Sequence, residues 1–327
     1  MTGPTAPPVP LQISTVMEHV PCNACGADDA QVLYPMLDQR RVEAIPLDER
    51  FAASSDIQGG EQIVRCRRCG LAYMDPRVIP SSIMAGYTEA DNSTYVSQSS
   101  GRMSTFRRCV KLLEPYAGTH RRAIDIGCAG GFFVKAADEA GWEVHGVEPS
   151  RYLVDYARRE LGLSRVEQGT LGDRRYPDGF FDAVTYWDVL EHLHDPMQEL
   201  REVSRVVRPG CVVLINYPNF ASVWSRLLGR KWWFVLSVHL YYFTPDTMRK
   251  MLDQVGYDVI ESRMHFQELS LGYLFMRLES YAPAVGRLGG RVAKVLRIAE
   301  WPVRYYASQV NVIAKRKGSL RVQTASR

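Results

Sequence analysis

Four cysteines stand in two pairs, each with two residues between its members. The first pair is Cys22 and Cys25, and the second is Cys66 and Cys69. Thiolates at this spacing sit in tight knuckles that suit one tetrahedral Zn²⁺ ion. A site with four sulfur ligands has no open position for a substrate. The spacing therefore predicts a structural zinc ion, with free thiols as the alternative.

A second feature is a glycine-rich stretch, DIGCAGG, that runs from Asp125 to Gly131. It stands where a strand pattern gives way to a helical one, and glycine lets the backbone turn sharply and approach a ligand closely. Glu148 ends the next predicted strand, where a carboxylate can accept both hydroxyl hydrogens of a ribose. Ala129 replaces the middle glycine of the dinucleotide-binding pattern, which argues against a pyrophosphate. The pattern predicts a nucleoside site, with a tight structural turn as the alternative.

Four motifs, in order along the chain, resemble those of the class I S-adenosylmethionine (SAM)-dependent methyltransferases. They are IDIGCAGGF from Ile124, GVEPS from Gly146, FDAVTYWDVLEHL from Phe181 and VVRPG from Val206. The resemblance implies an α/β fold of the Rossmann-like, doubly wound type, with a mostly parallel sheet of seven strands and SAM as the cofactor. The cysteine pairs resemble the N-terminal zinc-ribbon module of bacterial methyltransferases that modify deoxysugars, surface polysaccharides or natural products.

The resemblance also implies which residues hold the cofactor. They are Asp125 and Gly127 at the methionine part of SAM, with Cys128 and Gly131 in the same loop, Glu148 at the ribose, Thr170 and Leu171 beside the adenine, and Asp188 at the methionine amine.

Methyl transfer from a sulfonium requires an aligned nucleophile and the exclusion of water, and it requires a base only when the acceptor starts protonated. His192, beside the expected position of the methyl group, and His239, after an aromatic insertion, are the candidate catalytic residues. Glu191 and His194 are neighbours that could orient His192 or bind a divalent ion. The alternative is that His192 bonds to the backbone and takes no part in the reaction.

Aromatic side chains crowd the insertion at residues 218–243, where the family builds its acceptor pocket. The insertion contains Trp224, Trp232, Trp233 and Phe234. Such side chains suit sugar rings, aromatic metabolites or lipid headgroups, although an unselective hydrophobic lid would have the same composition.

These residues require elements that place them at one edge of a sheet. From Arg122 onward, predicted strands at 123–126, 143–147, 166–168, 181–187, 211–217, 257–264 and 310–314 alternate with helices. One helix begins after Asp195, with Pro196 in its first turn, and another begins at Thr244. The alternation predicts a parallel, doubly wound sheet.

The chain divides accordingly into a zinc-ribbon module, a linker with a leading helix and a SAM-binding domain. The expected ranges are 1–15 for a disordered tail, 16–88 for the module, 89–118 for the linker, 119–317 for the domain with an acceptor insertion at 218–243 and a basic amphipathic insertion at 266–305, and 318–327 for a second disordered tail.

Basic residues alternate with apolar ones in residues 284–304, and acidic residues are absent there before Glu300. Such a helix can rest on an anionic membrane surface, or it can be a solvated face packed on its own domain. Glycines at 286, 289 and 290 weaken the helix.

Composition restricts the setting and the partners. Seven cysteines, an odd number, favour a reducing compartment, and the Pro-rich start is unlike a secretory signal, so we expect a cytoplasmic protein, with the inner membrane face as a peripheral location. A net charge of +4 is too small to indicate nucleic acid. The expected partner is a small-molecule or glycan acceptor, and the sequence does not define an oligomeric state.

The expected function is transfer of a methyl group from SAM to oxygen, and less favourably to carbon, of a sugar-containing, polysaccharide or secondary-metabolite acceptor. Two alternatives stay open. One is an RNA methyltransferase that grips nucleic acid with the zinc module, and the other is a non-catalytic SAM-binding scaffold.

Overall fold

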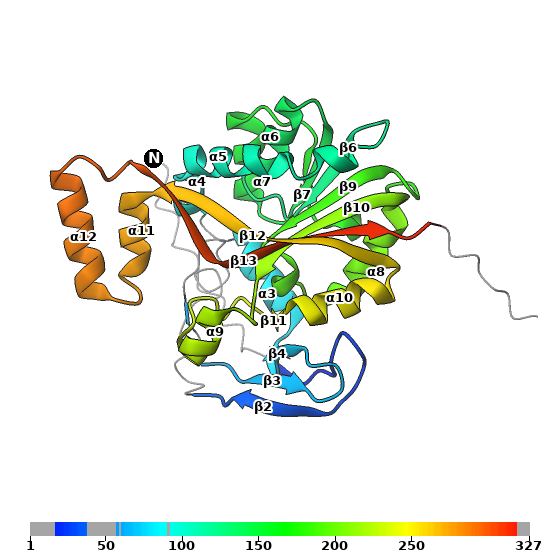
Figure 1. Ribbon diagram of the computed structural model, residues 1–327, viewed down its shortest axis with the longest axis horizontal. Helices are drawn as coiled ribbons and strands as arrows, with labels where there is room; N and C mark the ends of the chain where they lie inside the picture. Colours follow the sequence, from blue (N-terminus) through cyan, green and yellow to red (C-terminus); the bar gives the residue numbers. More distant parts are fainter. Residues whose placement is uncertain (1–16, 38–56, 59, 90–91, 319–327) are drawn as a thin grey trace, which may run out of the picture.

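A seven-stranded sheet forms the centre of the structure, a computed structural model that describes residues 17–37, 57–58, 60–89 and 92–318 (Figure 1). The strand order is β12-β13-β10-β9-β6-β7-β8. The strands are β6 (Arg122–Ile126), β7 (Glu143–Glu148), β8 (Val166–Gln168), β9 (Phe181–Trp187), β10 (Val207–Pro218), β12 (Tyr257–Ser270) and β13 (Pro302–Arg316). The five adjacent strands β10, β9, β6, β7 and β8 all run parallel to one another. Strand β13 runs antiparallel to both of its neighbours, β10 and β12. The expected mostly parallel, doubly wound sheet is confirmed.

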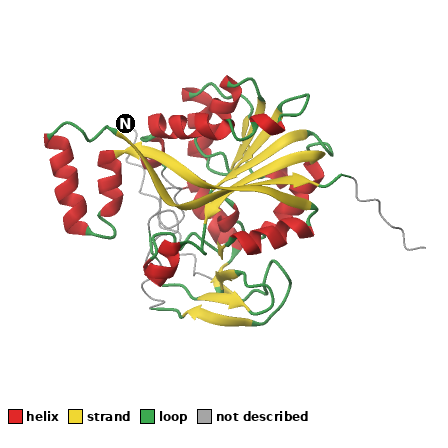
Figure 2. Ribbon diagram, in the orientation of Figure 1, coloured by secondary structure: helices red, strands yellow, loops and turns green. Residues whose placement is uncertain are grey.

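Helices cover both faces of this sheet (Figure 2). The first face carries α5 (Ser99–Val110), α6 (Phe132–Glu139) and α7 (Arg151–Glu160), and the second carries α8 (Pro196–Val206) and α10 (Pro245–Gln254). Side chains of a strand alternate between the two faces. In β10, Val212 and Leu214 belong to the hydrophobic cluster of the first face, whereas Val213 and Ile215 belong to that of the second. An all-apolar strand is therefore buried on both sides.

Two helices begin where their capping residues predict. The Asp195 side chain accepts a hydrogen bond from the backbone N–H of Gln198 at the start of α8. The Thr244 side chain accepts from the N–H of Thr247 at the start of α10. Each helix has a proline in its first turn, where no intrahelical donor is required.

The N-terminal module forms a small antiparallel sheet of its own. Its strands are β2 (Ala30–Tyr34), β3 (Ile63–Cys66) and β4 (Ala72–Met74), and the fourth, β11 (Tyr241–Tyr242), comes from the predicted acceptor insertion. A separate pair joins β1 (Met17–Glu18) to β5 (Arg77–Val78). Segment 38–56 and the two predicted tails, apart from Gly318, lie outside the described residues.

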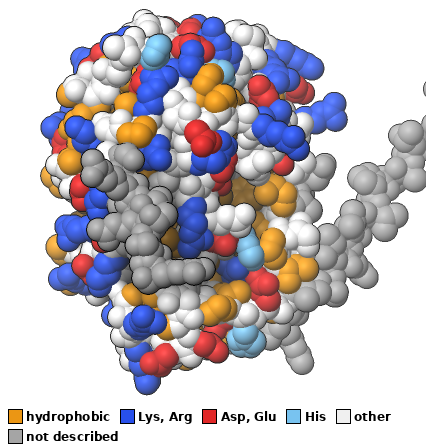
Figure 3. Space-filling model, turned by 90° about the vertical axis from the view of Figure 1, so that its right-hand side faces the viewer, with side chains coloured by type: hydrophobic (Ala, Val, Ile, Leu, Met, Phe, Trp, Pro, Cys, Tyr) orange, Lys and Arg blue, Asp and Glu red, His pale blue; other side chains and the backbone are white. Residues whose placement is uncertain are grey.

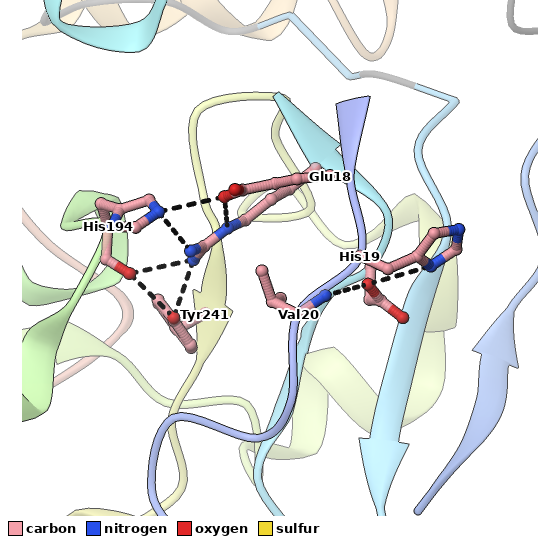
Figure 4. A network of polar contacts seen from close by, with 7 residues as sticks. Glu18, His19, Val20, His194 and Tyr241 are labelled. Carbon is pink, nitrogen blue, oxygen red and sulfur yellow. Dashed lines mark hydrogen bonds and ion pairs between the residues drawn. The ribbon is translucent and has the colours of Figure 1, made fainter. Parts of the chain in front are cut away.

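A partly buried polar network fixes the module to the main domain (Figure 4). The Arg77 guanidinium binds the Glu18 carboxylate at 3.0 Å and donates to the backbone carbonyl of His194 at 2.9 Å. The hydroxyl of Tyr241 also donates to that carbonyl, at 3.0 Å, and the His194 Nε2 lies 3.0 Å from Glu18. His194 thus joins the module to the domain, and its expected role beside His192 stays a prediction.

Strands β12 and β13 run beyond the sheet as a two-stranded ribbon that carries a helical hairpin, α11 (Leu271–Leu278) and α12 (Pro283–Val295), at its tip (Figure 1). Gly286 and Gly289 of α12 lie against α11, and a Cβ atom at Gly289 would meet the Phe275 ring at 2.2 Å. The glycines that weaken α12 as a helix therefore allow its close packing in the hairpin. The remaining elements are α3 (Pro80–Glu89), α4 (Ser93–Val96), α9 (Val223–Leu228) and the 3₁₀ turns η1 (Glu114–Tyr116), η2 (Leu171–Asp173), η3 (Leu190–His192) and η4 (Gly229–Lys231).

Candidate active site

A cavity of about 1130 Å³ lies at the carboxyl ends of β6, β7 and β9. The N-terminal helices, the aromatic insertion and the β12–β13 ribbon form its other walls. Small-molecule sites usually measure about 300–1,000 Å³, so the volume is sufficient for two ligands side by side. In an open α/β sheet this edge is where ligands bind.

Glu148 connects the glycine-rich loop to the end of β7. Its carboxylate accepts hydrogen bonds from the backbone N–H of Ala129 and of Ser150, each at 2.9 Å. Ala129 itself has a left-handed backbone, with φ of 46°, so the residue that replaces the expected glycine keeps the conformation that glycine favours. Burial raises the pKa of Glu148 to about 7, although both amide bonds favour the ionised form. The carboxylate lines the cavity and retains lone pairs for a ligand.

Asp188 follows the last residue of β9 and also lines the cavity. Its backbone is left-handed, with φ of 55°, a conformation that is rare outside glycine and frequent at functional sites. The Nε2 of Gln309, on β13, donates to its carboxylate at 2.5 Å. Burial raises the pKa of Asp188 to about 6, and the Gln309 hydrogen bond opposes that shift.

The other predicted cofactor residues divide into two groups. Gly127 and Thr170 join Glu148 and Asp188 in the cavity wall, whereas four others lie behind that wall in the described part of the chain. These four are Asp125, Cys128, Gly131 and Leu171.

The four residues behind the wall have structural contacts in place of the expected position at the cavity. Asp125 is buried and accepts a hydrogen bond from the Thr185 hydroxyl at 2.6 Å, which ties β6 to β9. A Cβ atom on Gly131 would meet Leu163 at 2.6 Å, so glycine permits close packing of α6. Leu171 and Cys128 are buried in the two hydrophobic clusters. Their contacts with a bound cofactor stay a prediction.

The two predicted catalytic histidines both line the cavity and lie together. The rings of His192 and His239 meet edge to face, with centroids 4.7 Å apart. Burial lowers the pKa of His192 to about 4 and the pKa of His239 well below its ordinary value, so both rings are neutral near pH 7. Glu191 lies beside them in η3.

Several cavity residues come from segments to which the sequence analysis gave no role in the site. Tyr87 of α3 places its hydroxyl 2.7 Å from Nδ1 of His192. Tyr95 and Arg102 lie in the polar run that was expected to be a linker, and the Arg102 guanidinium stacks on the Tyr95 ring at 3.5 Å. No periodic pattern in the sequence marks these positions.

The four paired cysteines gather at one point of the module. Their sulfur atoms all lie within 4.8 Å of one another, with Cys22 and Cys69 at 3.4 Å and Cys25 and Cys66 at 3.6 Å. A backbone hydrogen bond closes the turn at each pair. The N–H of Gly26 donates to the carbonyl of Cys22 at 2.7 Å, and the N–H of Gly70 donates to that of Cys66 at 3.0 Å. The spacing read from the sequence therefore corresponds to one cluster.

Comparison with known proteins identifies a methyltransferase domain in the chain. Residues 100–262 match the family model described as a methyltransferase domain. The ubiquinone biosynthesis O-methyltransferase of Methylococcus capsulatus is 33% identical over 106 residues, which are 30% of this chain and 44% of that protein. The enzyme of the same name from Dinoroseobacter shibae is 27% identical over 177 residues, 50% of this chain and 71% of its own length.

A solved SAM-dependent methyltransferase from Archaeoglobus fulgidus is 19% identical, with a TM-score of 0.48, and the comparison covers 69% of this chain and 100% of that one. The family match covers the glycine-rich loop, Glu148, Asp188, Glu191 and His192. These residues line or border the cavity. The chain belongs to the class I SAM-dependent methyltransferases.

Proposed function

We propose that this chain transfers a methyl group from SAM to an oxygen atom of a ring-containing metabolite. The observation that carries the proposal is the pair of acids at the strand ends, Glu148 (buried) and Asp188 (half-buried), which face one cavity from β7 and from the residue after β9. Glu148 would accept from the ribose hydroxyls, and Asp188 would bind the methionine ammonium. Arg102 has the opposite charge in the same wall and would bind the methionine carboxylate.

The proposed reaction moves the methyl group from sulfur to the acceptor oxygen in one step. Bound SAM supplies a methyl group on a positively charged sulfur. The acceptor oxygen forms the new C–O bond as the C–S bond breaks, the electron pair of that bond returns to sulfur, and the acceptor gives up its proton. The surrounding side chains hold the oxygen in line and exclude water, which contributes more than any single contact.

Aromatic side chains in the cavity wall support a ring-containing acceptor. Trp233 and Phe234 of the insertion line the cavity, together with Tyr281 and Tyr305. Flat side chains bind flat or ring-shaped ligands through their faces and edges. The relatives named ubiquinone biosynthesis O-methyltransferases support oxygen as the methylated atom.

Methyl-labelled SAM tests this function directly. The full chain is incubated with labelled SAM and, separately, phenolic metabolites, nucleotide sugars, a lipid extract and total RNA, and the products are identified by mass spectrometry. We expect label on the oxygen of a small ring-containing acceptor, and none with Glu148→Ala. Label confined to RNA, or SAM binding without transfer to any fraction, would contradict the proposal.

We propose in addition that the cysteine cluster holds a structural Zn²⁺ ion. Four thiolates at a zinc–sulfur distance of 2.3 Å would stand about 3.8 Å apart, close to the 3.4 Å and 3.6 Å of the two measured pairs. The ion would fix the two knuckles on the main domain. Asn23, between the first two cysteines, donates to Asp195 at 2.8 Å and accepts from the N–H of Met197 at 3.0 Å at the start of α8.

A third proposal is that the α11–α12 hairpin rests on an anionic membrane surface. Its large apolar side chains point outward, with Leu288 65% and Val295 80% exposed, while its glycines face α11. Four exposed basic residues share this outer surface, namely Arg287, Arg291, Lys294 and Arg297. Apolar and basic side chains on one exposed helix suit an anionic interface.

The opposite side of the molecule differs, because acidic, basic and apolar side chains are interspersed there (Figure 3). None of the described helices is long and apolar enough to cross a bilayer. Contact would therefore be peripheral. Tyr281, Leu278 and Leu274 of the hairpin segment line the cavity, so the same surface would bring a lipid-soluble acceptor to its mouth.

A further inference from the structure

Three potential metal ligands meet at the wall of the cavity. Glu191, His192 and His239 each offer a ligand atom, and these atoms all lie within 4.8 Å of one another. We call them the Glu–His–His cluster. The backbone N–H of Leu240 donates to the carbonyl of Glu191 at 2.8 Å. This bond fixes the loop that carries His239 against η3, so the three side chains are held by the fold.

Neighbouring oxygen atoms orient both rings. Nδ1 of His239 lies 2.8 Å from the carbonyl oxygen of Phe234. A carbonyl oxygen can only accept, so Nδ1 of His239 is the protonated atom and its Nε2 keeps its lone pair. Nδ1 of His192 lies 3.1 Å from the carbonyl oxygen of Val238 and 2.7 Å from the Tyr87 hydroxyl, and these two contacts fix the orientation of its ring. Histidines that bind metals are oriented by a second hydrogen bond of this kind.

The carboxylate of Glu191 lacks a partner that would explain its burial. The residue is 1% exposed, and neither side-chain oxygen has a hydrogen-bond partner within the described part of the chain. A buried polar group without a partner points to something that the protein binds there.

We propose that the Glu–His–His cluster binds one divalent transition-metal ion through the Glu191 carboxylate and one ring nitrogen of each histidine. One carboxylate and two imidazoles suit Zn²⁺, Mn²⁺, Fe²⁺ or Co²⁺. Three protein ligands leave positions open for water or a substrate atom, unlike the closed cysteine cluster. His192 also borders the cavity, so an open position would face the acceptor.

Metal binding at this cluster does not depend on which acceptor is methylated. A role of the ion in activating the acceptor rests on the proposed function. An acceptor hydroxyl bound to a divalent ion loses its proton to water more readily, and its oxygen keeps the electron pair that forms the C–O bond. His192 would then act as a ligand.

Metal analysis of the full chain tests the site. The protein is equilibrated with Zn²⁺, dialysed against metal-free buffer and analysed by mass spectrometry for bound metal, and Mn²⁺ binding is followed in parallel by electron paramagnetic resonance. We expect about two zinc ions per chain, one in each cluster, or one zinc and one Mn²⁺. Glu191→Gln and His239→Gln should weaken the second ion at least about tenfold and leave the first in place.

His265→Gln is the matched control, because His265 is a buried histidine of the same cavity outside the cluster. It should keep both ions. Unchanged SAM affinity in Glu191→Gln shows that this variant is folded. The proposal is overturned if the wild-type chain binds no ion beyond the cysteine cluster, or if Glu191→Gln and His239→Gln bind the second ion as tightly as wild type. A second ion without any methyl transfer would support the site and contradict the proposed function.

Discussion

Gln309 donates from Nε2 to the carboxylate of Asp188 at 2.5 Å. Strand β13, which carries Gln309, therefore holds the acid that follows β9. The contact joins residues 121 positions apart in the sequence. Asn216 takes part in the same buried group, because its side-chain oxygen lies 3.4 Å from the Gln309 nitrogen. The position of Asp188, and with it the predicted ammonium site, depends on β13.

Gln309→Leu tests this dependence. The substitution leaves the half-buried Asp188 carboxylate without its donor, which costs about 1.5–3 kcal/mol of unfolding free energy when the lost hydrogen bond involves a charged group. Urea denaturation at neutral pH measures the change. Gln254→Leu is the control, because Gln254 is exposed on α10 and bonds only to the preceding turn. Equal stability of the two variants would show that Gln309 does not hold Asp188.

The affinity for SAM should depend on pH through Glu148. Its pKa is raised to about 7, and the ionised form is the better acceptor for ribose hydroxyls. Protonation therefore competes with binding below this value, and we expect the dissociation constant to rise about tenfold between pH 8 and pH 6. Glu148→Gln, which cannot ionise, should bind more weakly with a nearly flat profile over this range. A steep profile in that variant would assign the dependence to another group.

Zinc in the cysteine cluster predicts a specific loss. Cys66→Ser removes one of four thiolates, so the zinc content at the cluster should fall from about one ion per chain to a small fraction of that. Loss of the ion should also make the N-terminal module sensitive to proteolysis. Cys211→Ser is the control, because Cys211 lies outside the cluster. Full zinc content in Cys66→Ser would show that the cluster is not a four-thiolate site.

The hairpin predicts binding to acidic vesicles. Sedimentation with vesicles that contain phosphatidylserine should carry down the wild-type chain, and added salt should reduce this binding because charges contribute to it. Replacing Leu288 and Val295 by Asp should abolish it, since both are exposed apolar side chains of α12. Leu227→Asp, at an exposed position of α9, should bind like wild type. Equal binding to neutral vesicles, or binding that survives the double substitution, would argue against the hairpin.

The central sheet could be predicted from sequence because its strands are short, apolar and separated by helices with clear starts. The predicted ranges 166–168 and 181–187 are those of β8 and β9. The capping residues Asp195 and Thr244 act locally, so a sequence pattern is sufficient to find them.

The two strands of the ribbon are longer than the sequence pattern predicts. The predicted ranges 257–264 and 310–314 cover only parts of β12 and β13. Register shifts interrupt their pairing, one of them between Met264 and Phe266, and Ser308 has a left-handed backbone with φ of 71°. Such irregularities break the alternation of apolar and polar residues on which strand prediction depends.

The sequence predicts only those cavity residues that follow strands of the central sheet. Glu148 and Asp188 follow strand patterns, whereas Tyr87, Arg102 and Gln309 reach the cavity through tertiary packing. Their neighbours in sequence give no periodic signal for such a role. The outward orientation of the apolar residues in α12 was equally hidden, because it depends on contacts between its glycines and α11.

Calorimetric titration of the full chain with SAM and with S-adenosylhomocysteine tests the central claim most directly. We predict one site for each nucleoside, no binding of NAD, and an affinity for SAM that falls about 10- to 100-fold in Glu148→Ala, the loss expected when hydrogen bonds to a charged group are removed. Failure to bind either nucleoside, binding of NAD in their place, or an unchanged affinity in Glu148→Ala would contradict the assignment of this cavity as a SAM site.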